Sequence, residues 1–174
     1  MVRDKEPFRQ RGVLVVLGQP VLVAADGPRV IEFNVRLGDP EAQVVLPLID
    51  EPLLPILIAC AAGALRQTSV RLGTDRLTGV VLASRGYPES SESGRPIRGI
   101  DAAEMIPGVT VYHAGTSQKE RQIVTAGGRV LTVVGRGEDF AEAIARAYAG
   151  VLQISFDGMH YRHDIGRKAL SMQP

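Results

Sequence analysis

The sequence predicts a fold of the α+β class, in which mostly antiparallel strands are joined by one packed amphipathic helix. Three observations lead to this prediction. Residues 30–36 alternate between apolar and polar side chains, as in a strand with one buried face. Short β-branched runs separated by glycines follow between residues 69 and 134. Apolar residues then recur three and four positions apart over 139–152, which predicts an amphipathic helix.

Length and composition limit the kinds of protein this chain can be. Its 174 residues suit one domain, or one domain with an attached piece, and 45% hydrophobic residues are enough for a packed core. The net charge of +1 argues against a nucleic-acid-binding surface or a charged membrane patch. Cys60 is the only cysteine, which excludes a disulfide framework, and its apolar neighbours predict a small buried side chain. Without an apolar signal region or a membrane-spanning run, a cytoplasmic location is expected.

The first part of the chain is predicted to form a hairpin and then a short helix. The turn sequence A-D-G-P separates strands expected at 21–24 and 29–36. The helix is expected at 40–48, with Asp39 as its N-cap and Pro40 at its first position.

A second helix is expected at 52–62, where an apolar run is ended by Gly63. This run is too short to span a bilayer. The pattern changes after it, so we place a boundary near residues 63–67, with domains at 1–64 and 65–174.

The second domain is predicted to be small and mostly antiparallel, with one helix packed on it. Its strands are expected at 69–72, 78–84, 109–113, 122–125, 129–134 and 154–156. The Gly127-Gly128 pair is expected to turn a hairpin between the strands at 122–125 and 129–134. One helical turn is expected at 101–105, and the polar segment 85–98 is expected to be an exposed, flexible loop.

Three polar side chains on the strand at 30–36 are the main candidate site. Glu32, Asn34 and Arg36 share one face, because residues two apart in a strand point the same way. A carboxylate beside an amide oxygen suits Mg²⁺ or Mn²⁺, and an arginine next to them can hold a phosphate. The alternative is an edge strand whose polar face is merely solvated, with Arg36 in a salt bridge to Asp39 or Glu41.

Other candidates carry weaker signals. His113 ends a predicted strand, where a histidine with a structural role is commoner than a catalyst. His160 and His163 are three residues apart, but no third ligand lies nearby in sequence, so a surface or packing role is favoured. The sequence G-G-R at 127–129 is better explained by a turn than by a phosphate cradle.

Several separate stretches resemble one enzyme family, phosphoribosylamine–glycine ligase, also called glycinamide ribonucleotide synthetase. They occur in the family's order and are E-F-N at 32–34, R-L-G-D-P-E-A-Q at 36–43, V-V-L-A-S-R-G-Y-P at 80–88, H-A-G-T at 113–116, G-G-R-V-L at 127–131 and G-M-H-Y-R-H-D-I-G at 158–166. The chain departs from the family at Arg85, where glycine is frequent. Because several motifs agree, the resemblance is specific, although it covers only the C-terminal part of such an enzyme.

The resemblance implies an ATP-grasp remnant followed by the family's C-terminal domain. The family uses ATP to activate glycine as an acyl phosphate and joins it to 5-phosphoribosylamine in purine synthesis. By resemblance, Glu32 and Asn34 are metal ligands for Mg²⁺ or Mn²⁺, and Arg36 is the catalytic arginine beside the transferred phosphate.

This chain is expected to be inactive alone, because it lacks the nucleotide-clamping lobe and the lobe that holds the amine substrate. Three hypotheses stay open. The chain is a truncated or split ligase that works with a partner chain carrying the missing N-terminal lobes, a non-catalytic binding or interaction module derived from the enzyme, or a degenerate product without function. Small-molecule substrates are expected for the full-length family, and neither nucleic acid nor membrane is an expected partner.

Overall fold

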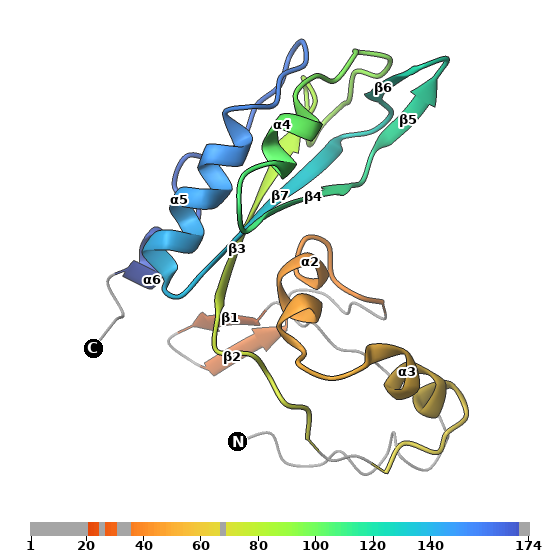
Figure 1. The fold of residues 1–174 in the computed structure, drawn as a ribbon, viewed down its shortest axis with the longest axis vertical. Helices are drawn as coiled ribbons and strands as arrows, with labels where there is room; N and C mark the ends of the chain where they lie inside the picture. The colour runs from red at the N-terminus through yellow and green to blue at the C-terminus, as the bar shows by residue number, and fades with distance from the viewer. Residues whose placement is uncertain (1–20, 25–26, 31–35, 67–68, 171–174) are drawn as a thin grey trace. The chain divides into compact units, whose positions relative to one another are not determined.

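The computed structural model describes residues 21–24, 27–30, 36–66 and 69–170 (Figure 1). The chain divides into two compact units, the first comprising residues 1–42 with 49–73 and the second residues 43–48 with 74–174. The predicted α+β class is confirmed, since the strands pair antiparallel and helices pack beside them. The units are defined by spatial contacts, and the predicted division into 1–64 and 65–174 stays a prediction.

The described part of the first unit includes the predicted hairpin. Strand β1 (Val21–Ala24) pairs antiparallel with β2 (Gly27–Val30), and Ala24 lies opposite Gly27 across the turn. Gly27 has φ +121°, a backbone conformation that residues other than glycine rarely adopt. The hairpin is therefore confirmed, but β2 begins at Gly27, inside the predicted turn, and residues 31–35 of the strand expected at 29–36 lie outside the described residues.

Helix α3 (Leu53–Ala61) is the predicted second helix of this unit. Gly63 ends it with φ +64° and donates its N–H to the Cys60 carbonyl at 3.1 Å. None of the residues in α3 is buried. The prediction that Cys60 is buried was therefore wrong, because its thiol lies on a helix that the unit covers only partly.

The strand predicted at 69–72 is reduced to a single bridge between Leu72 and Ile49. Next to this bridge, the Arg71 side chain bonds the Asp50 carboxylate at 3.1 Å and its backbone carbonyl accepts the Asp50 N–H at 2.9 Å.

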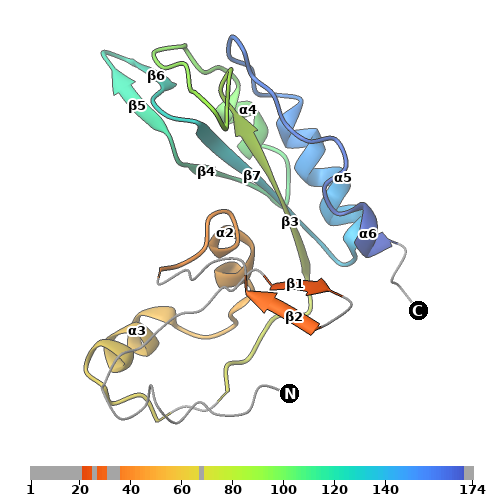
Figure 2. The same ribbon diagram turned by 180° about the vertical axis from the view of Figure 1, so that it is seen from behind.

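The second unit is built on a three-stranded antiparallel sheet. Strand β7 (Arg129–Gly137) lies between β3 (Arg76–Ala83) and β4 (Val109–His113), and Figure 2 shows this order from behind. Val133 faces Val80 on one side and Val111 on the other. Buried aliphatic side chains form the core under the helix, and they include Val80, Leu82, Val109, Val111, Leu131, Val133, Ala147, Val151 and Ile154.

Helix α5 (Phe140–Val151) covers one face of this sheet (Figure 1), as the spacing of its apolar residues predicted. Its N-cap is Asp139, whose carboxylate accepts the Glu142 N–H at 2.8 Å. Ala143, Ala147, Gly150 and Val151 are its buried residues. Small residues on this face let the helix backbone approach the sheet closely.

The first predicted helix, at 40–48, differs in the structure. Most of its residues, 43–48, belong to the second unit. Helix α2 (Ala42–Val45) is followed by the 3₁₀ turn η1 (Leu46–Leu48), so the expected helix at 40–48 is two short pieces. The chain turns through Asp39 and Pro40 before α2, and the Ala42 N–H donates to the Gly38 carbonyl at 3.0 Å. The prediction that Asp39 immediately precedes the helix as its N-cap was therefore wrong.

The predicted hairpin around Gly127-Gly128 was wrong. Strand β6 (Gln122–Thr125) pairs instead with β5 (Thr116–Lys119), a strand that the sequence did not reveal. Both edges of β7 are occupied by β3 and β4, so β7 has no free edge for β6. The β5–β6 turn contains Glu120 at φ +55° and no glycine, which explains why it carried no turn signal.

The segment 85–98 is a loop, but main-chain hydrogen bonds hold it. Pro96 bridges Val124, and Arg98 exchanges two bonds of 3.0 Å with Ser155. Ile97 is buried at 9% exposure, so the expected exposed and flexible loop is in part an edge of the fold.

The strand expected at 154–156 is reduced to one bridging residue. Helix α4 (Ile100–Glu104) lies where one helical turn was predicted, and α6 (Arg167–Leu170) was not predicted.

Candidate functional site

The predicted metal–phosphate site lies mostly outside the part of the chain that the structure describes. Glu32 and Asn34 are among the undescribed residues, so their predicted roles remain predictions. Arg36 is described, and its guanidinium is exposed, with one N–H donated to the Leu37 carbonyl at 2.9 Å. The Glu41 side chain lies against Gly38, where an added Cβ would come within 2.5 Å of its carboxylate oxygen.

The chemistry of the two predicted ligands, Glu32 and Asn34, can be compared with the preferences of a metal ion. A carboxylate and an amide oxygen, as offered by Glu32 and Asn34, are the hard ligands that Mg²⁺ and Mn²⁺ prefer. The donor set therefore fits such an ion. In the described ranges, no group of three or more His, Cys, Asp or Glu side chains is arranged to hold a metal. His160 and His163 accordingly form no metal cluster there.

In the second unit, the resembling motifs converge although they are far apart in sequence. Gly115 of H-A-G-T donates its N–H to the Arg129 carbonyl at 2.8 Å, and its own carbonyl accepts the Ala126 N–H at 2.7 Å. A Cβ on Gly115 would lie 2.8 Å from the Gly127 Cα. The backbones of the two motifs touch here, which requires glycine.

The motif at 80–88 joins the same corner. Ser84, which is buried, donates its hydroxyl to the Gly127 carbonyl at 3.0 Å, and its N–H bonds the Gly128 carbonyl at 2.9 Å. The Tyr87 ring lies on Gly128, where any Cβ would overlap it. Residues 127 and 128 are thus glycines because neighbouring groups pack closely against them. Their predicted role in a hairpin turn is corrected to this packing role.

The C-terminal motif at 158–166 contacts both β3 and α5. Ala83 and His160 exchange two backbone hydrogen bonds, of 2.9 and 3.0 Å. Tyr148 of α5 donates its hydroxyl to the Arg162 carbonyl at 2.8 Å and accepts the Ile165 N–H at 3.1 Å. The histidine ring of His163 lies 4.5 Å from that of Tyr161, centroid to centroid, in keeping with the packing role favoured for it.

Arg162 and Asp164 form an exposed bidentate pair in this motif. The guanidinium donates to the two carboxylate oxygens at 2.9 and 2.7 Å. The hydrogen bond from Arg162 lowers the pKa of the Asp164 carboxyl below its usual range and raises the pKa of the guanidinium.

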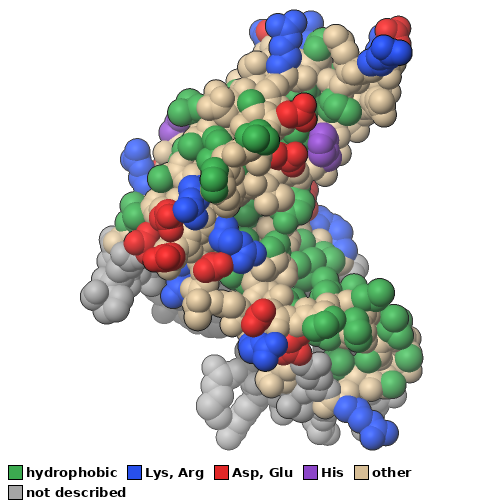
Figure 3. Space-filling view, viewed as in Figure 1, with side chains coloured by type: hydrophobic (Ala, Val, Ile, Leu, Met, Phe, Trp, Pro, Cys, Tyr) green, Lys and Arg blue, Asp and Glu red, His purple; other side chains and the backbone are tan. Residues whose placement is uncertain are grey.

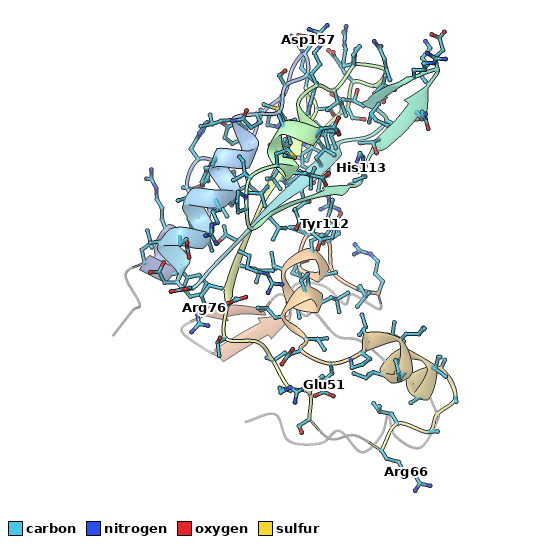
Figure 4. All side chains as sticks on the ribbon, in the orientation of Figure 1. Glu51, Arg66, Arg76, Tyr112, His113 and Asp157 are labelled. Carbon is cyan, nitrogen blue, oxygen red and sulfur yellow. The ribbon has the colours of Figure 1, made fainter. Side chains whose placement is uncertain are left out.

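His113 lies at the end of β4 (Figure 4) and lines a hollow of about 380 Å³. Its Nδ1 is 3.0 Å from the Thr116 hydroxyl, which fixes the ring beside the loop that follows. Arginine and acidic side chains share the hollow, whose charged lining residues are Arg98, Asp101, Glu104 and Arg121. The histidine is therefore held by a structural bond and also borders a polar depression.

Arg85, where the family frequently has glycine, takes part in a charged cluster. It bonds Asp157 at 3.0 Å and lies 3.4 Å from Glu92, and Arg95 bonds the same two carboxylates at 3.6 and 2.9 Å. The cluster ties the 85–98 loop to the turn after α5, where Figure 4 marks Asp157. Each side chain is more than one-third exposed, so each pair contributes little stability.

Comparison with known proteins decides the family. The model of the phosphoribosylglycinamide synthetase C domain matches residues 77–168, which hold the sheet, α5 and the converging motifs. The chain belongs to this family. It is similar to the phosphoribosylamine–glycine ligases of Leifsonia xyli, with 47% identity over 152 residues, and of a Synechocystis strain, with 47% identity over 168 residues.

These matches cover 86% and 95% of this chain but only 36% and 39% of the relatives. The chain therefore spans little more than a third of the length of the curated relatives it matches. A similar ligase of Arabidopsis thaliana, 46% identical over 145 residues, is described as chloroplastic.

Solved structures give the same answer. The phosphoribosylamine–glycine ligase of Thermotoga maritima matches with a TM-score of 0.67 and 34% identity, over 83% of this chain and 35% of that one. The biotin carboxylase domain of a Hydrogenobacter thermophilus 2-oxoglutarate carboxylase, solved with MgADP, matches with a TM-score of 0.52 and 18% identity, which shows likeness of fold alone. The chain thus belongs to the glycinamide ribonucleotide synthetase family. Packing within the family's C-terminal domain explains the motifs at 80–166.

Proposed function

We propose that this chain is the C-terminal portion of a phosphoribosylamine–glycine ligase, which forms glycinamide ribonucleotide from ATP, glycine and 5-phosphoribosylamine in purine synthesis. The observation that carries the proposal is the match to ligases at 40–47% identity, covering 82–95% of this chain. The segment R-L-G-D-P-E-A-Q at 36–43 adds the family resemblance beside the proposed metal ligands.

Glu32 and Asn34 would hold Mg²⁺ or Mn²⁺, which neutralises phosphate charge when it is bound. Arg36 would lie beside the transferred phosphate of ATP and stabilise the charge that develops on the acyl phosphate. Its exposed guanidinium carries five N–H donors, one of which is donated to the neighbouring Leu37 carbonyl.

The chain by itself would be inactive as a ligase. Its relatives are more than twice as long, and a nucleotide-clamping lobe and an amine-binding lobe each need roughly a hundred residues. We therefore propose that a polypeptide carrying these N-terminal lobes completes the site, and that the complex works in the cytoplasm. Of the helices in the described ranges, none has the length and apolar character to cross a membrane.

The test is an assay of ADP release that depends on glycine and phosphoribosylamine, with Mg²⁺ present. The chain would be assayed alone and then mixed with a separately produced N-terminal ligase portion. We expect turnover only in the mixture, and Arg36→Ala should lower it by roughly 10²- to 10³-fold, as for loss of one donor to a developing charge. Arg66→Ala changes another exposed arginine of the same unit and should leave the rate unchanged. Turnover by the chain alone would refute the proposal.

A second candidate is a non-catalytic binding or interaction module. It is favoured by the second unit, which contains the whole matched family domain and its own buried core but none of the three predicted site residues. This candidate predicts that the chain binds a purine-pathway protein or a metal ion, and that no mixture restores turnover.

A further inference from the structure

Helix α3 presents an apolar stripe to solvent within the first unit. Leu54, Leu57, Ile58 and Ala61 are exposed, and their spacing of three and four residues places them on one side of the helix. We call these four residues the α3 face. Exposed fractions reach 66% for Leu54 and 60% for Ile58. Figure 3 shows hydrophobic side chains gathered over the region of α3.

The opposite side of α3 is also apolar but is partly covered. Leu53, Ile56, Ala59 and Cys60 are half-buried within the unit. The sequence from 53 to 65 contains no charged residue at all. A helix that is apolar all round belongs inside a larger protein or a membrane, whereas a surface helix normally has one polar side.

A membrane does not fit this helix. Its nine residues rise about 14 Å, less than half of the roughly 30 Å of a bilayer core. Charged groups stand close to its first turn, where Asp50 pairs with Arg71 and Glu51 accepts the Arg71 N–H. An apolar centre next to charged groups is the arrangement of a protein interface with a polar rim.

We propose that the α3 face docks into an apolar groove of the polypeptide that supplies the N-terminal portion of the ligase. The proposal rests on the proposed function, because the occupant is the part of the relatives that this chain does not span. That part is large, since the matches cover 36% and 39% of two relatives and 35% of the Thermotoga maritima chain. The side chains at i, i+3, i+4 and i+7 form the pattern of a helix bound in a groove.

The α3 face is smaller than a complete interface. It consists of three partly exposed aliphatic side chains and an alanine, whereas a stable complex buries about 800 Å² on each partner. It therefore acts as the central anchor of a wider contact. Truncating or charging such anchors has the largest effect on binding, whereas contacts around them are nearly neutral.

The experiment measures binding of the chain to the separately produced N-terminal portion by calorimetry. We expect Leu54→Glu and Leu57→Glu each to weaken binding by tenfold or more, and the double variant by at least a hundredfold. Both side chains are exposed, so the unit should keep its fold, which circular dichroism would check. The matched control is Leu152→Glu, which charges an exposed leucine of the second unit and should leave binding unchanged. No binding, or binding that the glutamate variants leave unchanged, would overturn the proposal.

Sedimentation of the chain alone tests the other occupant, a second copy. A dimer that Leu57→Glu dissociates would replace the proposed partner and overturn the inference. The proposed function is tested separately by turnover. A complex that needs the α3 face but shows no ADP release would refute the ligase activity alone, whereas turnover unaffected by the glutamate variants would refute only the docking.

Discussion

Replacing Gly135 by alanine should separate helix α5 from the sheet. An added Cβ would lie 3.0 Å from the Ala147 Cα and would overlap the Ala143 carbonyl oxygen and the Ala147 amide nitrogen. All three atoms belong to the backbone of α5, so no side-chain rotation relieves the overlap. The helix must move by about 1 Å to restore ordinary contact distances.

The expected loss follows from that movement. Overpacking of this kind costs about 3 kcal/mol at the upper end of its usual range. Removal of a flexible glycine from a strand returns up to about 1 kcal/mol. The net destabilisation is therefore about 2 kcal/mol, equivalent to a fall in melting temperature of about 10 °C for a unit of this size.

Urea unfolding followed by tyrosine fluorescence provides the measurement. The chain has no tryptophan, and all four tyrosines lie in the second unit, so the signal reports on this unit. Gly79→Ala is the matched control on the other face of the same sheet. Its Cβ would lie 3.1 Å from Cγ1 of Val44, a side chain that can adjust, so a change within about 1 kcal/mol is expected. Equal effects of the two variants would refute the reasoning.

Two further predictions concern exposed groups of the second unit. Asp139→Ala should destabilise α5 by about 1 kcal/mol, because the Glu142 N–H loses its cap, and Asp139→Asn should retain most of the stability in the same urea experiment. Asp164 should titrate below its usual pKa of about 4, and Arg162→Gln should raise that pKa towards the usual value in an NMR titration. Because the folded pKa is lowered, the pair stabilises the fold above about pH 4 and loses this contribution as the pH falls through the folded pKa. An unchanged Asp164 titration in Arg162→Gln would contradict the assigned cause.

The stability predictions and the docking proposal concern different units of the chain. Gly135, Asp139 and the Arg162–Asp164 pair all concern the second unit, which has its own core. The α3 face belongs to the first unit, in which no residue of the helix is buried. Stability variants of the second unit and docking variants of the first therefore address separate properties of the chain.

Local sequence signals determined the elements that depend on neighbours in the chain. The 3-and-4 spacing located α5 to within a residue, because a helix is built from contacts three and four residues apart. The strands at 109–113 and 122–125 were also placed correctly. Gly63 ended α3 where expected, since a left-handed residue after a helix favours glycine. The linear order of several motifs was enough to indicate the family.

Tertiary structure alone decided which strands pair and why the motif glycines are there. Pairing joins residues that are distant in sequence, so the strand bounds did not reveal that β7 lies between β3 and β4 or that β6 pairs with β5. The turn at Glu120 adopts a positive φ without glycine, and local propensity gives no sign of it. Gly128 resembled a turn residue, but it is small because the Tyr87 ring packs on it. Such close approaches depend on two distant segments meeting, which the sequence pattern does not encode locally.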